Sequence, residues 1–116
     1  MKLRGGWEGI SFLNDGQYDR AITCFNKVLE KNPNDAAYSF RGEAYCEKGQ
    51  YDKAIADCAK AIEINPRNAQ AYNTRGFAYF YLKEYDKAWD DVHKAQSLGY
   101  KPRFLKALRE ASGRQK

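Results

Sequence analysis

The side chains best suited to chemistry in this chain are one histidine, two adjacent aspartates and three cysteines. His93 has no second histidine or nearby cysteine with which to share a metal ion, and a metal site needs three or four converging ligands. Asp90 and Asp91 are consecutive, so on a helix they point to different sides and cannot act as a pair. The cysteines form no Cys-x-x-Cys motif, which is typical of structural thiols; they are Cys24, Cys46 and Cys58. The sequence therefore predicts no enzyme, no metal and no cofactor.

The overall composition indicates one soluble domain. The chain has 116 residues, of which 43% are hydrophobic and 30% charged, values that are ordinary for a globular protein. It contains no apolar run long enough to cross a membrane, and its basic N-terminus lacks the apolar stretch of a secretory signal. We predict a single domain over residues 1–116 and a cytoplasmic location.

All of the net charge of +5 lies near the C-terminus. Residues 1–97 carry 14 basic and 14 acidic side chains, whereas residues 98–116 carry six basic side chains and Glu110 alone. Arg103, Lys106 and Arg109 recur three apart, which predicts a basic stripe on a last helix where phosphates could bind. Few aromatic residues accompany them for base stacking. We therefore expect a solubilising surface and rank nucleic-acid contact as the lesser alternative.

The sequence contains an internal repeat of 33 to 34 residues. The same two steps connect three sets of residues in phase: Gly9, Gly42 and Gly76, then Tyr18, Tyr51 and Tyr85, then Ala21, Ala54 and Ala88. Within each unit, apolar residues at three-to-four spacing predict two antiparallel helices. Small residues are needed where the helices cross, so Gly42 and Ala54 should lie in near contact.

Local signals set the ends of these helices. Gly16 and Gly49 predict left-handed stops after the first helix of their units; Lys83 stands at the third such place, so that turn should be strained or differently shaped. Asp35 precedes the first helix of the second unit and Asn68 precedes that of the third, so each can cap the free amide groups at the start of its helix. Gly5-Gly6 predicts that the first helix starts near Trp7. We expect helix pairs at about 7–32, 35–65 and 69–98, and a last helix at about 102–111.

The repeated residues resemble the tetratricopeptide repeat. The second unit reads Tyr38-x-x-Arg41-Gly42-x-x-Tyr45, Ala54-x-x-x-Cys58 and Pro66, and the third reads Tyr72-x-x-Arg75-Gly76-x-x-Tyr79 and Ala88-x-x-x-Val92. The resemblance implies an all-α right-handed superhelix of three repeats, at about 2–34, 35–68 and 69–100. It also implies a capping helix at about 102–111, followed by a flexible tail at 112–116.

The resemblance further implies protein binding in a concave trough lined by the first helix of each pair. The positions that we predict to line it are Trp7, Ile10, Leu13, Phe40, Glu43, Asn73, Phe77, Phe80 and Tyr81. Such an apolar surface favours docking of an apolar peptide or helix. Two alternatives remain open at this point: some of these rings pack between repeats, or the chain binds a second copy of itself through the same surfaces.

One well-known partner class of the family is disfavoured by the residues present. A branch of the family clamps the acidic C-terminus of heat-shock chaperones with basic and amide side chains. The corresponding places here hold Gly6, Ile10, Phe40, Gln70 and Thr74. None of them carries the positive charge that carboxylate recognition needs, so the sequence predicts a different partner.

Overall fold

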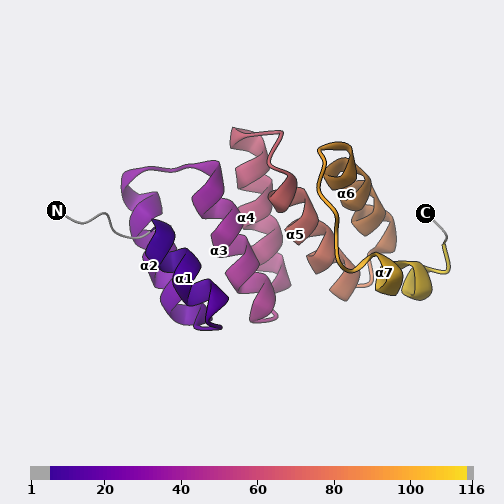
Figure 1. The fold of residues 1–116 in the computed structure, drawn as a ribbon, viewed down its shortest axis with the longest axis horizontal. Helices are drawn as coiled ribbons and strands as arrows, with labels where there is room; N and C mark the ends of the chain where they lie inside the picture. Colours follow the sequence, from indigo (N-terminus) through magenta and orange to yellow (C-terminus); the bar gives the residue numbers. More distant parts are fainter. Residues whose placement is uncertain (1–5, 115–116) are drawn as a thin grey trace.

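The computed structural model describes residues 6–114, and this part of the chain contains seven α-helices and no strands. The three pairs and the last helix follow one another along a molecule of 51 × 25 × 21 Å (Figure 1). This arrangement confirms the predicted all-α repeat fold. The predicted start of repeat 1 at residue 2 and the tail residues 115–116 lie outside the described part. The helices are α1 (Gly6–Asn14), α2 (Tyr18–Lys31), α3 (Asp35–Glu47), α4 (Tyr51–Ile64), α5 (Ala69–Tyr81), α6 (Tyr85–Ser97) and α7 (Leu105–Ser112).

The turn inside each helix pair has the same shape in all three repeats. Gly16 and Gly49 both have φ +80°, and Lys83 has φ +64° at the equivalent place. Each backbone N–H donates to the carbonyl three residues earlier, at 2.9 to 3.1 Å. The third turn is therefore not differently shaped. Its lysine adopts the left-handed conformation, which costs about 1 kcal/mol for a residue that bears a Cβ.

The glycines at the helix crossings allow the paired helices to approach closely. A Cβ added to Gly42 would lie 3.2 Å from the carbonyl oxygen of Ala54 and 3.0 Å from the Cys58 sulfur, which confirms the predicted near contact of α3 and α4. Gly76 repeats the arrangement against the Ala88 carbonyl oxygen, at 3.3 Å. Larger residues at these places would force the helices apart.

The N-cap of α3 differs from the prediction. Asn34 caps α3, because its side-chain oxygen accepts a hydrogen bond from the Ala37 N–H at 2.9 Å. Asp35 is instead the first helical residue, and its carboxylate accepts from the side chains of Asn65 and Asn68, each at 3.0 Å. Asn68 does cap α5, as predicted. Asp35 thus ties the start of repeat 2 to the start of repeat 3.

A buried core runs through the stack from one repeat to the next. Repeats 1 and 2 share a cluster built on Leu13, Phe25 and Ala44, and the C-terminal end has one built on Trp89 and Leu108. Leu13 is only 6% exposed. Within residues 6–114, every helix is too short or too polar to span a lipid bilayer.

The C-terminal end is more ordered and starts its helix later than the sequence predicts. Helix α7 begins at Leu105 instead of residue 102, because Pro102 and Phe104 are buried in the connection that crosses α5. Residues 112–114 were expected to be flexible, yet Ser112 accepts a hydrogen bond from the Trp89 indole N–H at 3.1 Å. Arg114 forms an ion pair with Asp86. These side-chain contacts hold the end of the chain onto α6.

Candidate functional site

The first helices of the three pairs lie closer to one another than the second helices do. Among residues 6–114, α1 contacts α3 and α3 contacts α5, whereas the second helices contact each other marginally at most. A stack spaced more tightly on one side curves toward that side, so α1, α3 and α5 lie on the concave face. We call this face, together with the connection 98–104 that crosses it, the trough.

The C-terminal half of the trough contains a cavity of about 480 Å³. We call it the trough pocket. Helices α3 and α5 form two of its walls and the connection 98–104 forms the third. Its walls carry Glu43 and Glu47 from α3, Asn73 and Phe77 from α5, and Tyr100 and Arg103 from the connection. The pocket therefore brings together three of the predicted trough residues, Glu43, Asn73 and Phe77.

The acceptor groups of the trough pocket are only partly satisfied within the protein. Glu43 accepts a hydrogen bond from the Gln70 amide at 2.6 Å. Burial raises the pKa of Glu43, the Gln70 hydrogen bond opposes that rise, and the neighbouring Glu47 adds to it. The side-chain oxygen of Asn73 is buried and has no hydrogen-bond partner among residues 6–114. A ligand that donates hydrogen bonds would satisfy these oxygens.

The thiol in the trough pocket is not an activated nucleophile. Burial, together with the smaller effects of the Glu47 and Glu43 charges, raises the pKa of Cys46 to about 12. A thiol with such a pKa is almost entirely protonated at neutral pH, and the thiolate is the reactive form. In residues 6–114, no group of three or more His, Cys, Asp or Glu side chains is placed to hold a metal ion.

Three of the predicted trough residues serve packing between elements. Leu13 belongs to the core, so its prediction as a surface contact is wrong. Phe40 stacks on Phe25 of the preceding repeat, with ring centroids 5.9 Å apart. Phe80 packs against Tyr85 and Phe104. Phe40 and Phe80 therefore pack against neighbouring elements, as the packing alternative expects, but both rings stay partly exposed.

Two of the remaining apolar trough residues, Trp7 and Tyr81, are exposed. Trp7 is 64% exposed at the start of α1, and Tyr81 is 52% exposed at the end of α5. Phe77 lies between Tyr81 and the trough pocket, with its ring 4.8 Å from the Tyr81 ring. Ile10 is partly buried against the core of repeat 1. Trp7 and Tyr81 thus place accessible aromatic surface at separate points of the trough.

Sequence reasoning missed the contribution of the connection 98–104. Tyr100 and Arg103 line the trough pocket, although neither is among the predicted trough residues and Arg103 was predicted to lie on the last helix. Arg103 precedes α7, so it does not share a helical stripe with Lys106 and Arg109. The one available signal was Leu98-Gly99-Tyr100 in place of the Asn-Pro that closes the other repeats. Gly99 has φ +92°, which turns the chain toward the trough.

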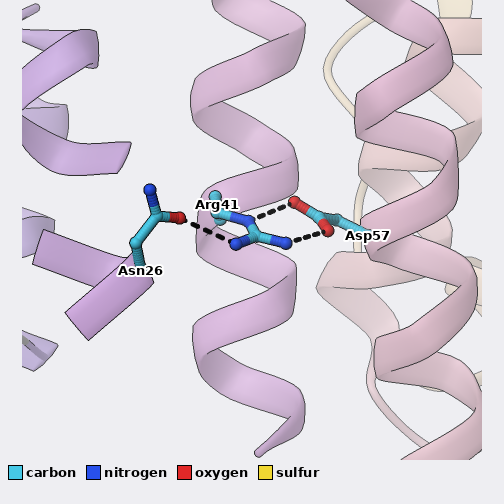
Figure 2. Close-up of polar contacts among 3 residues, drawn as sticks. All are labelled: Asn26, Arg41 and Asp57. Carbon is cyan, nitrogen blue, oxygen red and sulfur yellow. Dashed lines mark hydrogen bonds and ion pairs between the residues drawn. The ribbon is translucent and has the colours of Figure 1, made fainter. Parts of the chain in front are cut away.

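A buried ion pair fixes the orientation of α3 between its neighbours. The Arg41 guanidinium donates two hydrogen bonds of 2.7 Å to the Asp57 carboxylate of α4, and a third of 2.8 Å to the Asn26 side chain of α2 (Figure 2). The hydrogen bonds with Asp57 raise the pKa of Arg41. Arg75 and Asp91 form the same bidentate pair in repeat 3, at 2.8 and 2.9 Å. These pairs hold the trough helices in place.

Comparisons with known proteins agree with this architecture. A family model described as tetratricopeptide repeat matches residues 6–35, and one described as TPR repeat matches residues 42–83. A search of curated proteins found no significant match.

Solved structures of similar shape cover nearly the whole chain. The first TPR domain of human RPAP3 is 28% identical, with a TM-score of 0.85 over 93% of this chain and 87% of that chain. The first TPR of Spaghetti (RPAP3), with the same values, was solved with the HSP90 peptide SRMEEVD. The TPR2B domain of yeast Sti1, in a complex with pHsp70, is 25% identical, with a TM-score of 0.82 over 92% of this chain and 91% of that chain.

Proposed function

The chain belongs to the tetratricopeptide-repeat family, and we propose that it is an adaptor module that binds a segment of a partner protein in its trough. The observation that carries this proposal is the trough pocket, which lies on the concave face between two repeats. Exposed apolar surface beside a pocket is typical of a binding site. Here Tyr81 supplies exposed aromatic surface next to Phe77, which lines the pocket, and Trp7 supplies exposed surface at the other end of the trough.

Similar structures support the class of partner. The Spaghetti (RPAP3) domain named above was solved with an HSP90 peptide and the Sti1 domain in a complex with pHsp70. The shared fold makes a segment of another protein the expected ligand here too. The chaperone tail itself remains disfavoured. Gln70 and Thr74, at two of the clamp positions, are uncharged; Thr74 is also buried, and the Gln70 amide already donates to Glu43. These two positions therefore offer a carboxylate no charge-assisted donor. We expect the peptide SRMEEVD to bind weakly or not at all.

A selection of 12-residue peptides displayed on phage tests the proposal. The bait is the intact chain, and the affinity of each enriched peptide is then measured by fluorescence anisotropy. We expect a variant carrying Trp7→Ala and Tyr81→Ala to bind about tenfold more weakly, since truncating an exposed aromatic anchor typically costs more than 1 kcal/mol. Ile64→Ala is the matched control, because Ile64 is also exposed but lies at the end of α4, away from the trough. Equal affinities for all three proteins would contradict trough binding.

Self-association through the same surfaces is the second candidate. It is favoured by the 64% exposure of Trp7 and the 52% exposure of Tyr81. Sedimentation equilibrium over a concentration series separates the two proposals. A mass that rises with concentration and falls back with Tyr81→Ala supports self-association, whereas a constant monomer mass contradicts it.

A further inference from the structure

We infer that the trough pocket accepts a positively charged side chain, lysine or arginine, carried by a partner segment with apolar residues on either side. The inference rests on the proposed function and specifies the chemistry of its ligand. Its basis is the charge, the unpaired acceptor and the aromatic surface that meet in this one cavity.

The charge of the pocket wall on α3 is negative. Glu43 and Glu47 are four residues apart, so they lie on the same face of the helix, and both line the cavity. Glu43 has one amide hydrogen-bond partner, and Glu47 accepts a long one of 3.5 Å from the Tyr18 hydroxyl. Neither carboxylate has a cationic partner among residues 6–114. A ligand cation would therefore meet two carboxylates that form no ion pair with another side chain of residues 6–114.

The opposite wall supplies an unused acceptor. The Asn73 side-chain oxygen is buried without a donor, and Asn73 lines the same cavity as Glu43. A buried oxygen that lacks a donor is unfavourable. An ammonium or guanidinium group brings several N–H donors at once, so it can reach the carboxylates and this amide oxygen together. A carboxylate ligand would bring none.

The remaining surface of the pocket is aromatic. Phe77 lines the cavity from α5 and Tyr100 lines it from the connection 98–104. Cations bind favourably over aromatic faces, and the same rings can pack against apolar neighbours of the charged residue. The protein already uses this contact elsewhere, because the Arg41 guanidinium lies 5.7 Å from the rings of both Tyr38 and Tyr45.

The positive charge of Arg103 is unfavourable for a basic ligand in the pocket and provides a way to test the charge of the ligand. It lines the pocket and forms no hydrogen bond or ion pair within residues 6–114. Its charge repels a basic ligand and attracts an acidic one. A basic partner and an acidic partner, such as a chaperone tail, therefore predict opposite effects when Arg103 is neutralised.

The test uses three pentapeptides, Ac-Ala-Phe-Xaa-Phe-Ala-NH2 with arginine, glutamine or glutamate at Xaa, titrated into the intact chain. Amide chemical shifts in ¹H–¹⁵N spectra locate the site and give Kd. We expect the arginine peptide to shift the signals of Glu43, Asn73, Phe77 and Tyr100, and to bind about tenfold more tightly than the glutamine peptide. The glutamate peptide should bind most weakly.

Variants with a single charge change sharpen the result. Glu43→Gln and Glu47→Gln should each reduce the preference for arginine over glutamine several-fold, and Arg103→Gln should raise it about two- to fivefold. Glu63→Gln makes the same charge change at an exposed site on α4 and should alter the preference less than twofold. The spectra report whether each variant is folded.

The outcomes separate this inference from the proposed function. Equal binding of the arginine and glutamine peptides at the trough would overturn the cationic ligand and leave trough binding in place. Tighter binding of the glutamate peptide, weakened by Arg103→Gln, would overturn it in favour of an acidic partner. If no peptide shifts any trough signal, both proposals fail.

Discussion

Repeat 1 and the two repeats that follow it share one backbone plan but join their helices with different chemistry. In repeats 2 and 3, an arginine from the first helix and an aspartate from the second form a bidentate ion pair. The equivalent positions of repeat 1 hold Glu8 and Cys24. There the crossing is filled by the Phe25 ring, which lies 2.7 Å from where a Cβ of Gly9 would be.

The repeat period therefore constrains the backbone, whereas the side chains in contact between the paired helices vary from repeat to repeat. A glycine is needed at the crossing in each repeat, because α1, α3 and α5 all approach their partners closely. The nearest side-chain atoms of the partner helix belong to the Phe25 ring at Gly9, to the Cys58 thiol at Gly42 and to Asp91 at Gly76. The trough pocket lies between repeats 2 and 3, where the ion pairs hold α3 and α5. The two repeats that form the trough pocket are thus the two whose helices are joined by ion pairs.

The largest expected effect comes from breaking one of these ion pairs. Asp57→Ala leaves the Arg41 guanidinium partly buried with Asn26 as its remaining hydrogen-bond partner. We expect it to lower the free energy of unfolding by about 3 kcal/mol. Urea unfolding followed by circular dichroism measures the change. Cys24→Ala at the equivalent place of repeat 1 should cost about 1 kcal/mol or less, and similar losses at the two sites would contradict the comparison.

The helix crossings should differ in how a substitution can be rescued. Gly9→Ala should cost about 2 kcal/mol because the new methyl group meets the buried Phe25 ring. In a protein that already carries Phe25→Leu, Gly9→Ala should lower the free energy of unfolding by less, because the smaller leucine side chain leaves room for the methyl group. The methyl group of Gly42→Ala would contact the backbone carbonyl oxygen of Ala54, which a side-chain change cannot remove. Cys58→Ala should therefore restore less of the lost free energy of unfolding. Double-mutant cycles of the free energy of unfolding measure the rescue at each crossing, and equal rescue at both would contradict the expected difference.

Introducing the arginine–aspartate ion pair of repeats 2 and 3 into repeat 1 tests whether the same contact can form there. We expect Glu8→Arg with Cys24→Asp to raise the free energy of unfolding by about 1 kcal/mol, the net value of charge-assisted hydrogen bonds. Cys24→Asp alone should be destabilising, because the charge of Glu8 already acts on residue 24. A double variant no more stable than Cys24→Asp alone would show that repeat 1 cannot adopt the geometry of its neighbours.

The smallest effect concerns the turns. Lys83→Gly should raise the free energy of unfolding by about 0.5 to 1 kcal/mol by removing the cost of a left-handed lysine. The reverse change, Gly49→Lys, should lower it by a similar amount, because Gly49 has φ +80° in the same kind of turn. Thermal melts should move by a few degrees in opposite directions. Shifts of the same sign would contradict the equivalence of the two turns.

The sequence alone determined the helix pairs, the family and the crossing points. It could do so because these features are local or periodic: a glycine stop, an Asn68 cap and a spacing of 33 to 34 residues are all visible in the linear chain. The same phase predicts Glu43, Asn73 and Phe77 on the first-helix face, and all three line the trough pocket.

Tertiary structure alone decided which of those residues remain accessible. Leu13 and Phe40 have the right phase for the trough, but Leu13 is buried in the core and Phe40 is partly buried against Phe25 of the preceding repeat. Tyr100 and Arg103 lie outside the repeat pattern and reach the pocket through the path of the connection 98–104. Periodicity specifies the direction in which a side chain leaves its own helix. What it then meets depends on residues distant in sequence, and only the folded chain brings them together.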